Sequence, residues 1–329
     1  MDNTVLWTAP VTGDVHEFPT PVVVNGIVYY PQNMGGDSLY ALNAATGDLI
    51  WKYRAGGNDD AVTVMDGLLY SPSDSLYCLD ALTGERIWAT FSANVYGNTP
   101  VVTDGRVYCG SHTSNCSDIY CLDAYTGAEI WRDTLSGGIS SCMAVWNDMV
   151  FIPTYAPGQE TPLYAVDAIT GAIIWENTDA FAGYWDSSPI VVDSAVYING
   201  HDGKLFFADQ NWGGSYHCLE APTGSTIWSL PGYQHGSSGI TDGVVFYGES
   251  YFPDGAKVYA LDCETGSELW SYQTGGMFIQ SSPAITDGVV YIAGTDWNLP
   301  ADLLYVPVRI HSTLRQQYLS SFPSRDGRQ

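Results

Sequence analysis

A short unit of sequence recurs six times along the chain and constrains its fold more than any other feature. The first copy, Leu39–Trp51, reads LYALNAATGDLIW, and the others are Leu76–Trp88, Ile119–Trp131, Leu163–Trp175, Tyr216–Trp228 and Val258–Trp270. The first half of each copy has apolar or small residues on both faces, which predicts a buried strand. The Thr-Gly pair predicts a tight turn, because Gly tolerates positive φ. Each unit is therefore expected to be a β-hairpin with the Trp on its second strand.

A second hairpin is expected before each unit. Its signal is a two-residue turn between apolar runs, seen at Asn25-Gly26, Asp66-Gly67, Asp104-Gly105, Asp242-Gly243 and Asp287-Gly288, and less cleanly at Asn147-Asp148 and Asp193-Ser194. Each repeat then supplies four antiparallel strands, named a to d in chain order. Four short strands at intervals of about forty residues are typical of one blade of a β-propeller.

The consensus Leu-Tyr-Ala-Leu-Asp-Ala-x-Thr-Gly-x-x-x-Trp resembles the pyrroloquinoline quinone (PQQ) type of propeller repeat. This is the blade of quinoprotein dehydrogenases and of the outer-membrane assembly scaffold lipoprotein. The resemblance covers residues 3 to 306 and implies that the Trp and the Thr-Gly turn lock neighbouring blades together. It is highly specific for the fold and weakly specific for function.

The two ends of the repeat region complement each other. Residues 4–9 carry Trp7 without a preceding Thr-Gly turn, as an isolated strand d would, whereas 282–285, 289–293 and 303–306 supply strands a, b and c without a Trp. We expect an all-β, seven-bladed propeller of four-stranded antiparallel blades, closed by the N-terminal strand completing the last blade, because closure removes exposed edges. Eight blades with part of the chain missing is the alternative. The propeller would span 1–308, and 309–329, which lacks the repeat, is expected to be a disordered or non-native tail.

Charge and hydropathy limit the partners. The net charge of −25 disfavours nucleic acid, whose phosphates would be repelled, and anionic membranes. No apolar run is long enough to span a bilayer. The residues after Met1 do not read as a signal peptide, so the chain is either cytoplasmic or a mature domain. The resemblance favours the periplasm, the cell surface or the extracellular space, with the chain as a monomer or one module of a larger surface protein.

The cysteines are expected to be structural. Cys78, Cys121 and Cys218 take a slot held elsewhere by Ala, and Cys109, Cys142 and Cys263 align with small or apolar core residues; Cys116 alone is expected in a loop. A Cys109–Cys116 disulfide is an open alternative. There is no Cys-x-x-Cys, which argues against a thiolate zinc site.

The candidate binding site is the set of loops that join strand d of one blade to strand a of the next. In a propeller strand a lines the central channel, and these d-to-a loops surround one of its openings. Their sequences vary where the strands repeat, and a variable rim on a rigid scaffold is typical of a binding surface. The rim residues chosen as ligand-binding candidates are Asp59, Tyr96, Tyr184, Trp185, Asp186, His235, Phe278 and Gln280. Ordinary solvated loops are the alternative interpretation.

These observations favour a non-catalytic binding or scaffold propeller that recognises a protein or a carbohydrate through the d-to-a loop face. A PQQ-dependent oxidoreductase is one alternative. The resemblance implies that such enzymes use adjacent cysteines, a Trp floor under the quinone and calcium, whereas here no two cysteines are adjacent and Asp59, Asp60 and Asp186 do not define a calcium cage. No catalytic residue, cofactor or metal is therefore predicted. A cell-envelope assembly scaffold is the other alternative, although no Cys suited to lipidation lies near residue 1.

Overall fold

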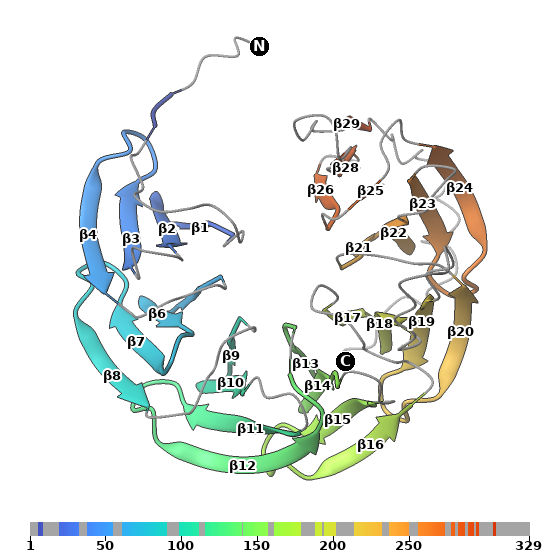
Figure 1. The fold of residues 1–329 in the computed structure, drawn as a ribbon, viewed down its shortest axis with the longest axis horizontal. Helices are drawn as coiled ribbons and strands as arrows, with labels where there is room; N and C mark the ends of the chain where they lie inside the picture. Colours follow the sequence, from blue (N-terminus) through green and yellow to red (C-terminus); the bar gives the residue numbers. More distant parts are fainter. Residues whose placement is uncertain are drawn as a thin grey trace, which may run out of the picture. The chain divides into compact units, whose positions relative to one another are not determined.

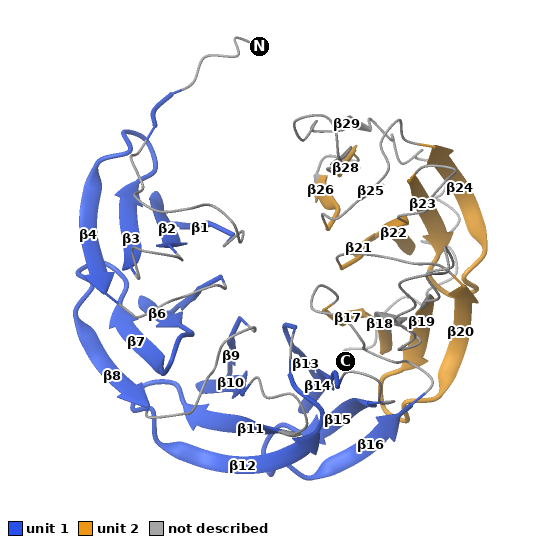
Figure 2. Cartoon of the chain, in the orientation of Figure 1, with its two compact units in different colours: residues 1–185 blue, residues 186–329 orange. Residues whose placement is uncertain are grey.

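The structure is a computed structural model, and it describes most of the repeat region. The described residues are 6–8, 20–32, 38–54, 61–90, 99–111, 116–139, 141–156, 161–178, 188–192, 194–201, 214–231, 237–249, 256–273, 278–279, 282–286, 289–292, 294–295 and 305–306. They fall into two compact units, residues 1–185 and 186–329, each of which is described by itself (Figure 2). Every regular element in these ranges is a β-strand. None of the described segments is a helix that could cross a bilayer.

Unit 1 contains four four-stranded antiparallel sheets, here blades 1 to 4, each formed by strands consecutive in the chain (Figure 1). Their strands are β1 (Val22–Val24), β2 (Ile27–Gln32), β3 (Ser38–Asn43), β4 (Leu49–Arg54), β5 (Thr63–Met65), β6 (Leu68–Ser71), β7 (Leu76–Asp80), β8 (Arg86–Thr90), β9 (Val101–Thr103), β10 (Arg106–Gly110), β11 (Cys116–Asp123), β12 (Glu129–Ser136), β13 (Ala144–Trp146), β14 (Met149–Pro153), β15 (Leu163–Asp167) and β16 (Ile173–Asn177). The expected order of strands a to d is confirmed in each.

Unit 2 contains blades 5 and 6, a three-stranded sheet that we call blade 7, and a small two-stranded sheet. Their strands are β17 (Ile190–Val192), β18 (Ala195–His201), β19 (Gly214–Glu220), β20 (Thr226–Pro231), β21 (Gly239–Thr241), β22 (Val244–Glu249), β23 (Lys257–Asp262), β24 (Glu268–Gln273), β25 (Phe278–Ile279), β26 (Ala284–Thr286), β27 (Val289–Tyr291), β28 (Gly294–Thr295) and β29 (Tyr305–Val306). Blade 7 consists of β26, β27 and β29, as strands a, b and c, and the two-stranded sheet pairs β25 with β28.

The two turns of each blade have the backbone conformation that their residues favour. At the a-to-b turn of blade 1, Asn25 and Gly26 both have positive φ, 50° and 77°, the type I′ geometry of two-residue hairpins. The turn at Asn147-Asp148 has the same geometry, with φ of 48° and 59°, although it lacks Gly. Asn and Asp tolerate this region better than other side chains. The sequence was therefore right about this hairpin where its turn signal was weak.

The c-to-d turns are held by the acidic or amide residue that ends strand c. In blade 4 the Asp167 carboxylate accepts hydrogen bonds from the backbone N–H of Ile169 at 3.0 Å and of Thr170 at 2.7 Å. The Thr170 hydroxyl donates to the same oxygen at 2.8 Å. Gly171 follows with a φ of 78°. These bonds satisfy backbone groups that the turn leaves unpaired, and they explain why the Asp-x-x-Thr-Gly pattern recurs.

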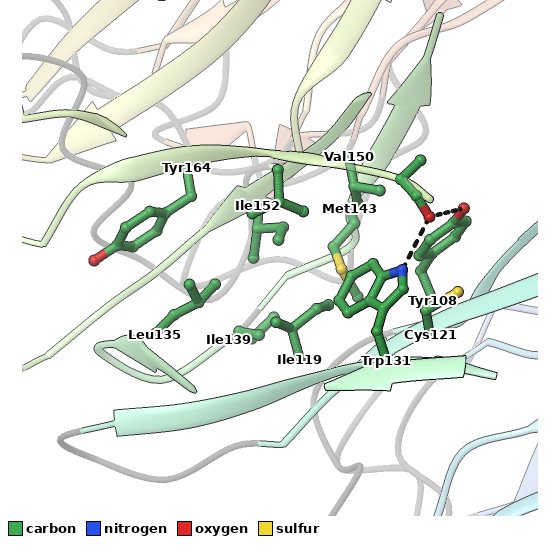
Figure 3. Packing of buried hydrophobic residues seen from close by; sticks show 12 residues of the cluster. Tyr108, Ile119, Cys121, Trp131, Leu135, Ile139, Met143, Val150, Ile152 and Tyr164 are labelled. Atoms are coloured by element: carbon green, nitrogen blue, oxygen red, sulfur yellow. Dashed lines mark hydrogen bonds between the residues drawn. The ribbon is translucent and has the colours of Figure 1, made fainter. Parts of the chain in front are cut away.

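Neighbouring blades are joined by a lock built around each Trp (Figure 3). The indole N–H of Trp131, in blade 3, and the hydroxyl of Tyr108 both donate to the carbonyl oxygen of Ala168, in blade 4, each at 3.0 Å. The indole ring also packs on Gly171, where an added Cβ would lie 2.7 Å from it. The same pair of bonds recurs in two other blades. Trp51 and Tyr29 both donate to the carbonyl of Ala81, and Trp88 and Tyr70 both donate to the carbonyl of Ala124.

The lock is equally clear in unit 2, where the indole of Trp228 donates to the carbonyl of Cys263 at 3.0 Å and packs on Gly266. The structural role that the resemblance implied for Trp and Thr-Gly is therefore confirmed. The Tyr of strand b is a component that the sequence analysis missed. Its hydroxyl shares the acceptor of the indole, and blades 4 and 6 carry Phe151 and Phe246 against their Trp instead.

Trp7 makes the same lock with blade 1. Its indole donates to the carbonyl of Ala44 at 2.9 Å, and the ring packs on Gly47, where an added Cβ would lie 2.7 Å away. Trp7 therefore makes the contacts of a strand-d Trp, although residues 6–8 do not form a strand. Closure through pairing of the N-terminal segment with β29 stays a prediction, as does the tail at 309–329, which lies outside the described residues.

The cysteine predictions are largely confirmed. Cys78, Cys109, Cys121, Cys218 and Cys263 are buried free thiols, and Cys142 is half-buried. Cys109 is free, so the alternative of a Cys109–Cys116 disulfide is wrong for this structure. Cys116 is also not in a loop: it is the first residue of β11, opposite Ser136 of β12. The longer strands of blade 3 extend the sheet to include it.

Candidate functional site

The predicted binding rim lies almost wholly outside the described part of the chain. Seven of its residues are in undescribed segments: Asp59, Tyr96, Tyr184, Trp185, Asp186, His235 and Gln280. Phe278 is described at the level of the backbone. It belongs to β25, where it pairs with Thr295 of β28, rather than to an irregular loop as expected. The rim as a binding site therefore stays a prediction, and what the structure describes is its base.

Hydroxyl side chains tie the blades together at the base of these loops. In unit 2, just before strand a of each blade, the Ser237 hydroxyl accepts a hydrogen bond from the Ser188 N–H at 2.9 Å. The Ser282 hydroxyl accepts one from the Ser237 N–H at 3.0 Å. In unit 1 the Thr63 hydroxyl donates to the carbonyl of Pro100 at 2.5 Å. Hydroxyl groups before or at the start of strand a therefore bridge successive blades in both units.

A row of stacked tyrosines lies between blades 5 and 6, close to this base. Tyr216 and Tyr247 stack with ring centroids 5.1 Å apart, and Tyr247 and Tyr259 with centroids 5.0 Å apart. The Ser238 hydroxyl donates to the Tyr216 oxygen at 2.6 Å. Burial raises the pKa of all three phenols above the ordinary value. They stay protonated at neutral pH. Sequence reasoning missed this stack because Tyr is common throughout the strands.

The connection from blade 3 to blade 4 is described from Gly137 to Met143 except for residue 140. Gly138 and Tyr155 exchange two backbone hydrogen bonds, of 2.6 and 2.8 Å. Ile139 is fully buried and packs so closely on Gly110 that a Cβ there would lie 2.5 Å from it. Figure 3 shows Leu135 and Ile139 joining the cluster around Trp131. This part of the loop face is thus packed into the core.

Three of the buried thiols, Cys78, Cys109 and Cys121, are unsuited to nucleophilic or redox chemistry at neutral pH. Burial raises the pKa of Cys78 and of Cys109 to about 12, and that of Cys121 to about 11. A thiol rather than a thiolate is present under these conditions, and the thiolate is the reactive form. Among the described residues, no three His, Cys, Asp or Glu side chains are placed to share a metal ion.

Five Trp residues of the repeat are not available as the floor of a site for a quinone, the cofactor that the fold family implies. A Trp that serves as the floor of a quinone site needs a ring face that is not already covered by a neighbouring blade. Trp7, Trp51, Trp88, Trp131 and Trp228 instead bond to the neighbouring blade and cover its turn glycine. The carboxylates weighed for calcium, Asp59 and Asp186, lie outside the described residues, and we derive no chemical step through a quinone.

Comparison with known proteins agrees with this architecture. A family model described as outer membrane protein assembly factor BamB matches residues 1–68, 72–215 and 213–301. The solved structure of BamB from Moraxella catarrhalis has a TM-score of 0.60 at 18% identity, covering 82% of this chain and 76% of that one. Quinohemoprotein alcohol dehydrogenase ADHIIG from Pseudomonas putida HK5 has a TM-score of 0.50 at 16% identity, covering 87% of this chain and 71% of that one.

Two curated proteins are similar in sequence, and the chain spans only part of each. Tetrathionate hydrolase from Acidithiobacillus ferrooxidans is 24% identical over 306 residues, which cover 89% of this chain and 52% of that protein. The serine/threonine-protein kinase AfsK from Streptomyces griseus is 34% identical over 115 residues, 33% of this chain and 14% of the kinase. The fold is thus a seven-bladed β-propeller like that of BamB. Since the family model spans most of the chain, the protein belongs to the PQQ-type propeller family of the outer membrane protein assembly factor BamB.

Proposed function

We propose that this protein is a non-catalytic scaffold that binds another protein through its d-to-a loop face. The observation that carries the proposal is that the repeated residues have structural roles, whereas the loops do not repeat. The Trp and Gly of the repeats, with a strand-b Tyr in blades 1 to 3, join neighbouring blades. The loops on that face instead vary in length and chemistry. A rigid frame that carries variable loops is suited to recognition.

The family supports a protein as the partner. BamB is an outer membrane protein assembly factor. A similar role here would place this chain in a cell envelope, with a segment of an envelope protein as ligand. A carbohydrate remains the alternative ligand for the same aromatic rim, because Tyr184 and Trp185 could stack on sugar rings as well as on apolar side chains.

The test is a double substitution in the rim. Y184A/W185A should abolish binding to peptide or glycan arrays, because both aromatic side chains are lost from the proposed contact. The melting temperature should change little, because neither residue belongs to the repeated lock. I87A, an exposed site on the outer strand of blade 2, is the matched control. Unchanged binding by the double variant would overturn this face as the site.

A PQQ-dependent oxidoreductase is the second candidate, supported by the similarity to the fold of a quinohemoprotein alcohol dehydrogenase. Purified protein would be mixed with the quinone and calcium, and dye reduction would be followed with alcohols and sugars as substrates. The scaffold proposal predicts no stoichiometric uptake of the quinone and no turnover. Tight uptake with turnover would replace it by the enzyme.

A further inference from the structure

The outer edge of blade 4 carries an apolar patch that the fold does not require. Ile169 in the c-to-d turn is 49% exposed, and Ile173 and Ile174 at the start of β16 are 47% and 44% exposed. We call these three residues the blade 4 patch. Core-facing residues of the same hairpin, such as Ala165 and Trp175, are buried. The three Ile side chains of the patch are thus not part of the core that the hairpin buries.

A β-bulge explains how two consecutive side chains can both face solvent. Ala165 of β15 opposes Trp175, but the next residue, Val166, opposes Ile173, so the register shifts and Ile174 has no partner. An extra residue of this kind re-aims its side chain and breaks the strict alternation of a strand. Every complete blade has the same bulge before its Trp, and therefore two exposed positions there.

Blade 4 differs from the others in what it places at these positions. The equivalents of Ile169, Ile173 and Ile174 are Ala45, Leu49 and Ile50 in blade 1, Leu82, Arg86 and Ile87 in blade 2, Tyr125, Glu129 and Ile130 in blade 3, Pro222, Thr226 and Ile227 in blade 5, and Glu264, Glu268 and Leu269 in blade 6. Of these six described hairpins, that of blade 4 has a large aliphatic side chain at all three positions. Ala172, between them, adds a further exposed apolar position.

The surroundings of the patch are negative. The described charged residues of blade 4, Asp148, Asp167 and Glu176, are all acidic. Within the blade, the Asp167 carboxylate accepts the N–H of Ile169 itself at 3.0 Å, exposed Glu176 follows Trp175 directly, and the backbone of Asp148 bonds to Ala168. An apolar surface bordered by these three acidic residues is complementary to a ligand that combines apolar and cationic side chains.

We propose that the blade 4 patch is a docking site for a basic segment of a partner protein that inserts apolar side chains against Ile169, Ile173 and Ile174. β16 is the edge strand of its sheet, so an extended segment can also pair with its backbone. The apolar contacts supply affinity and the acidic border selects for Lys and Arg. This surface is separate from the d-to-a loops and goes beyond the function proposed above.

The test uses the full chain and a labelled synthetic peptide that alternates Lys and Val. Fluorescence anisotropy should show binding that weakens about tenfold or more in I169T/I173T/I174T, because the apolar contacts are lost while every carboxylate is kept. The control I50T/I87T/I130T removes the same number of exposed Ile side chains from blades 1 to 3 and should bind like the wild type. A peptide alternating Lys and Ser should bind both proteins weakly and equally, through charge alone.

Three results would overturn the proposal. Equal binding by the wild type and the blade 4 variant would reduce the interaction to non-specific charge attraction. Equal weakening by the control variant would assign it to outer strands in general. Self-association of the wild type that is lost in the blade 4 variant, measured by sedimentation, would make a second copy the occupant. Because Tyr184 and Trp185 are unchanged throughout, these outcomes are independent of the test of the loop face.

Discussion

The c-to-d turns of blades 4 and 6 have the same backbone conformation but differ in the chemistry of their exposed side chains. In blade 4, Asp167 accepts the amide of Thr170 at 2.7 Å, and Gly171 has a φ of 78°. In blade 6, Asp262 accepts the amide of Thr265 at 2.9 Å, and Gly266 has a φ of 69°. Two of their solvent-facing positions nevertheless carry Ile in blade 4, Ile169 and Ile173, and Glu in blade 6, Glu264 and Glu268.

This contrast separates the residues that build a blade from those that give it a surface. The Asp, Thr, Gly and Trp of the repeat are constrained by hydrogen bonds and close packing, so a change at any of them affects the fold. Ile169 and Ile173, or Glu264 and Glu268, contact mainly solvent and can differ at little energetic cost. Recognition can therefore change from blade to blade while the frame remains constant.

Removing the lock itself should have the largest effect on the shared frame. Trp131→Ala takes away the bond to Ala168 and the buried ring, and should lower the free energy of unfolding by about 3–5 kcal/mol. Trp131→Phe keeps a ring and should lose about 1 kcal/mol from the missing hydrogen bond. Both would be measured by urea denaturation. The exposed neighbour substitution Ile130→Ala is the control, and a cost equal to that of Trp131→Ala would contradict the lock.

The turn glycines allow the packing part of the lock to be isolated. Gly171→Ala and Gly67→Ala impose similar backbone strain, since φ is 78° and 77°, and each should cost about 1–2 kcal/mol for that reason. A Cβ at Gly171 would also lie 2.7 Å from the Trp131 ring, whereas at Gly67 nothing lies within 4 Å. Gly171→Ala should therefore lose a further 1–3 kcal/mol or so. Equal midpoints in urea would remove the packing explanation.

The turn carboxylates predict a smaller, pH-dependent effect. Hydrogen bonds from the Thr170 hydroxyl and amide lower the pKa of Asp167, and equivalent bonds lower the pKa of Asp80 and Asp123. A lowered pKa means that the stabilisation is present above the unfolded value of about 4 and is lost as the pH falls through the folded values. Blade 1 has Asn43 here, whose side-chain oxygen accepts the same two amides.

D80N/D123N/D167N should therefore keep the turns and reduce the loss of stability on acidification. Urea midpoints measured from neutral pH down to about pH 3 would compare the variant with the wild type. Parallel acid profiles for the two proteins would show that these carboxylates do not contribute to the acid sensitivity.

The smallest change in stability is expected from exchanging the two surfaces. E264I/S267A/E268I gives blade 6 the residues of blade 4 at 264, 267 and 268, next to the exposed Leu269 that stands in place of Ile174. It should change the free energy of unfolding by less than about 0.5 kcal/mol. If apolar side chains at these positions are sufficient for docking, the variant should also bind the Lys-Val peptide more tightly than the wild type. A large loss of stability would show that these positions belong to the frame.

Most of the strands and turns of the blades could be predicted, because local sequence patterns that recur in each repeat specify them. Asn25-Gly26 and Asp167-x-x-Thr170-Gly171 are turn signals with a backbone reason, and both turns form as expected. The prediction failed at Cys116 and Phe278, which lie in strands where loops were expected. In both cases pairing with a partner strand overrode a segment that resembles a loop.

The sequence by itself determined the blade, its turns and the number of repeats, because each of these depends on residues within a few positions of one another. It also indicated the variable d-to-a loops as the candidate binding site, which stays a prediction. Only the tertiary structure decided which atoms join the blades, since the Tyr and Trp donors and the carbonyl they share come from residues 30 to 60 positions apart. It also decided that Ile173 and Ile174 face solvent together, because a bulge depends on the pairing of two strands.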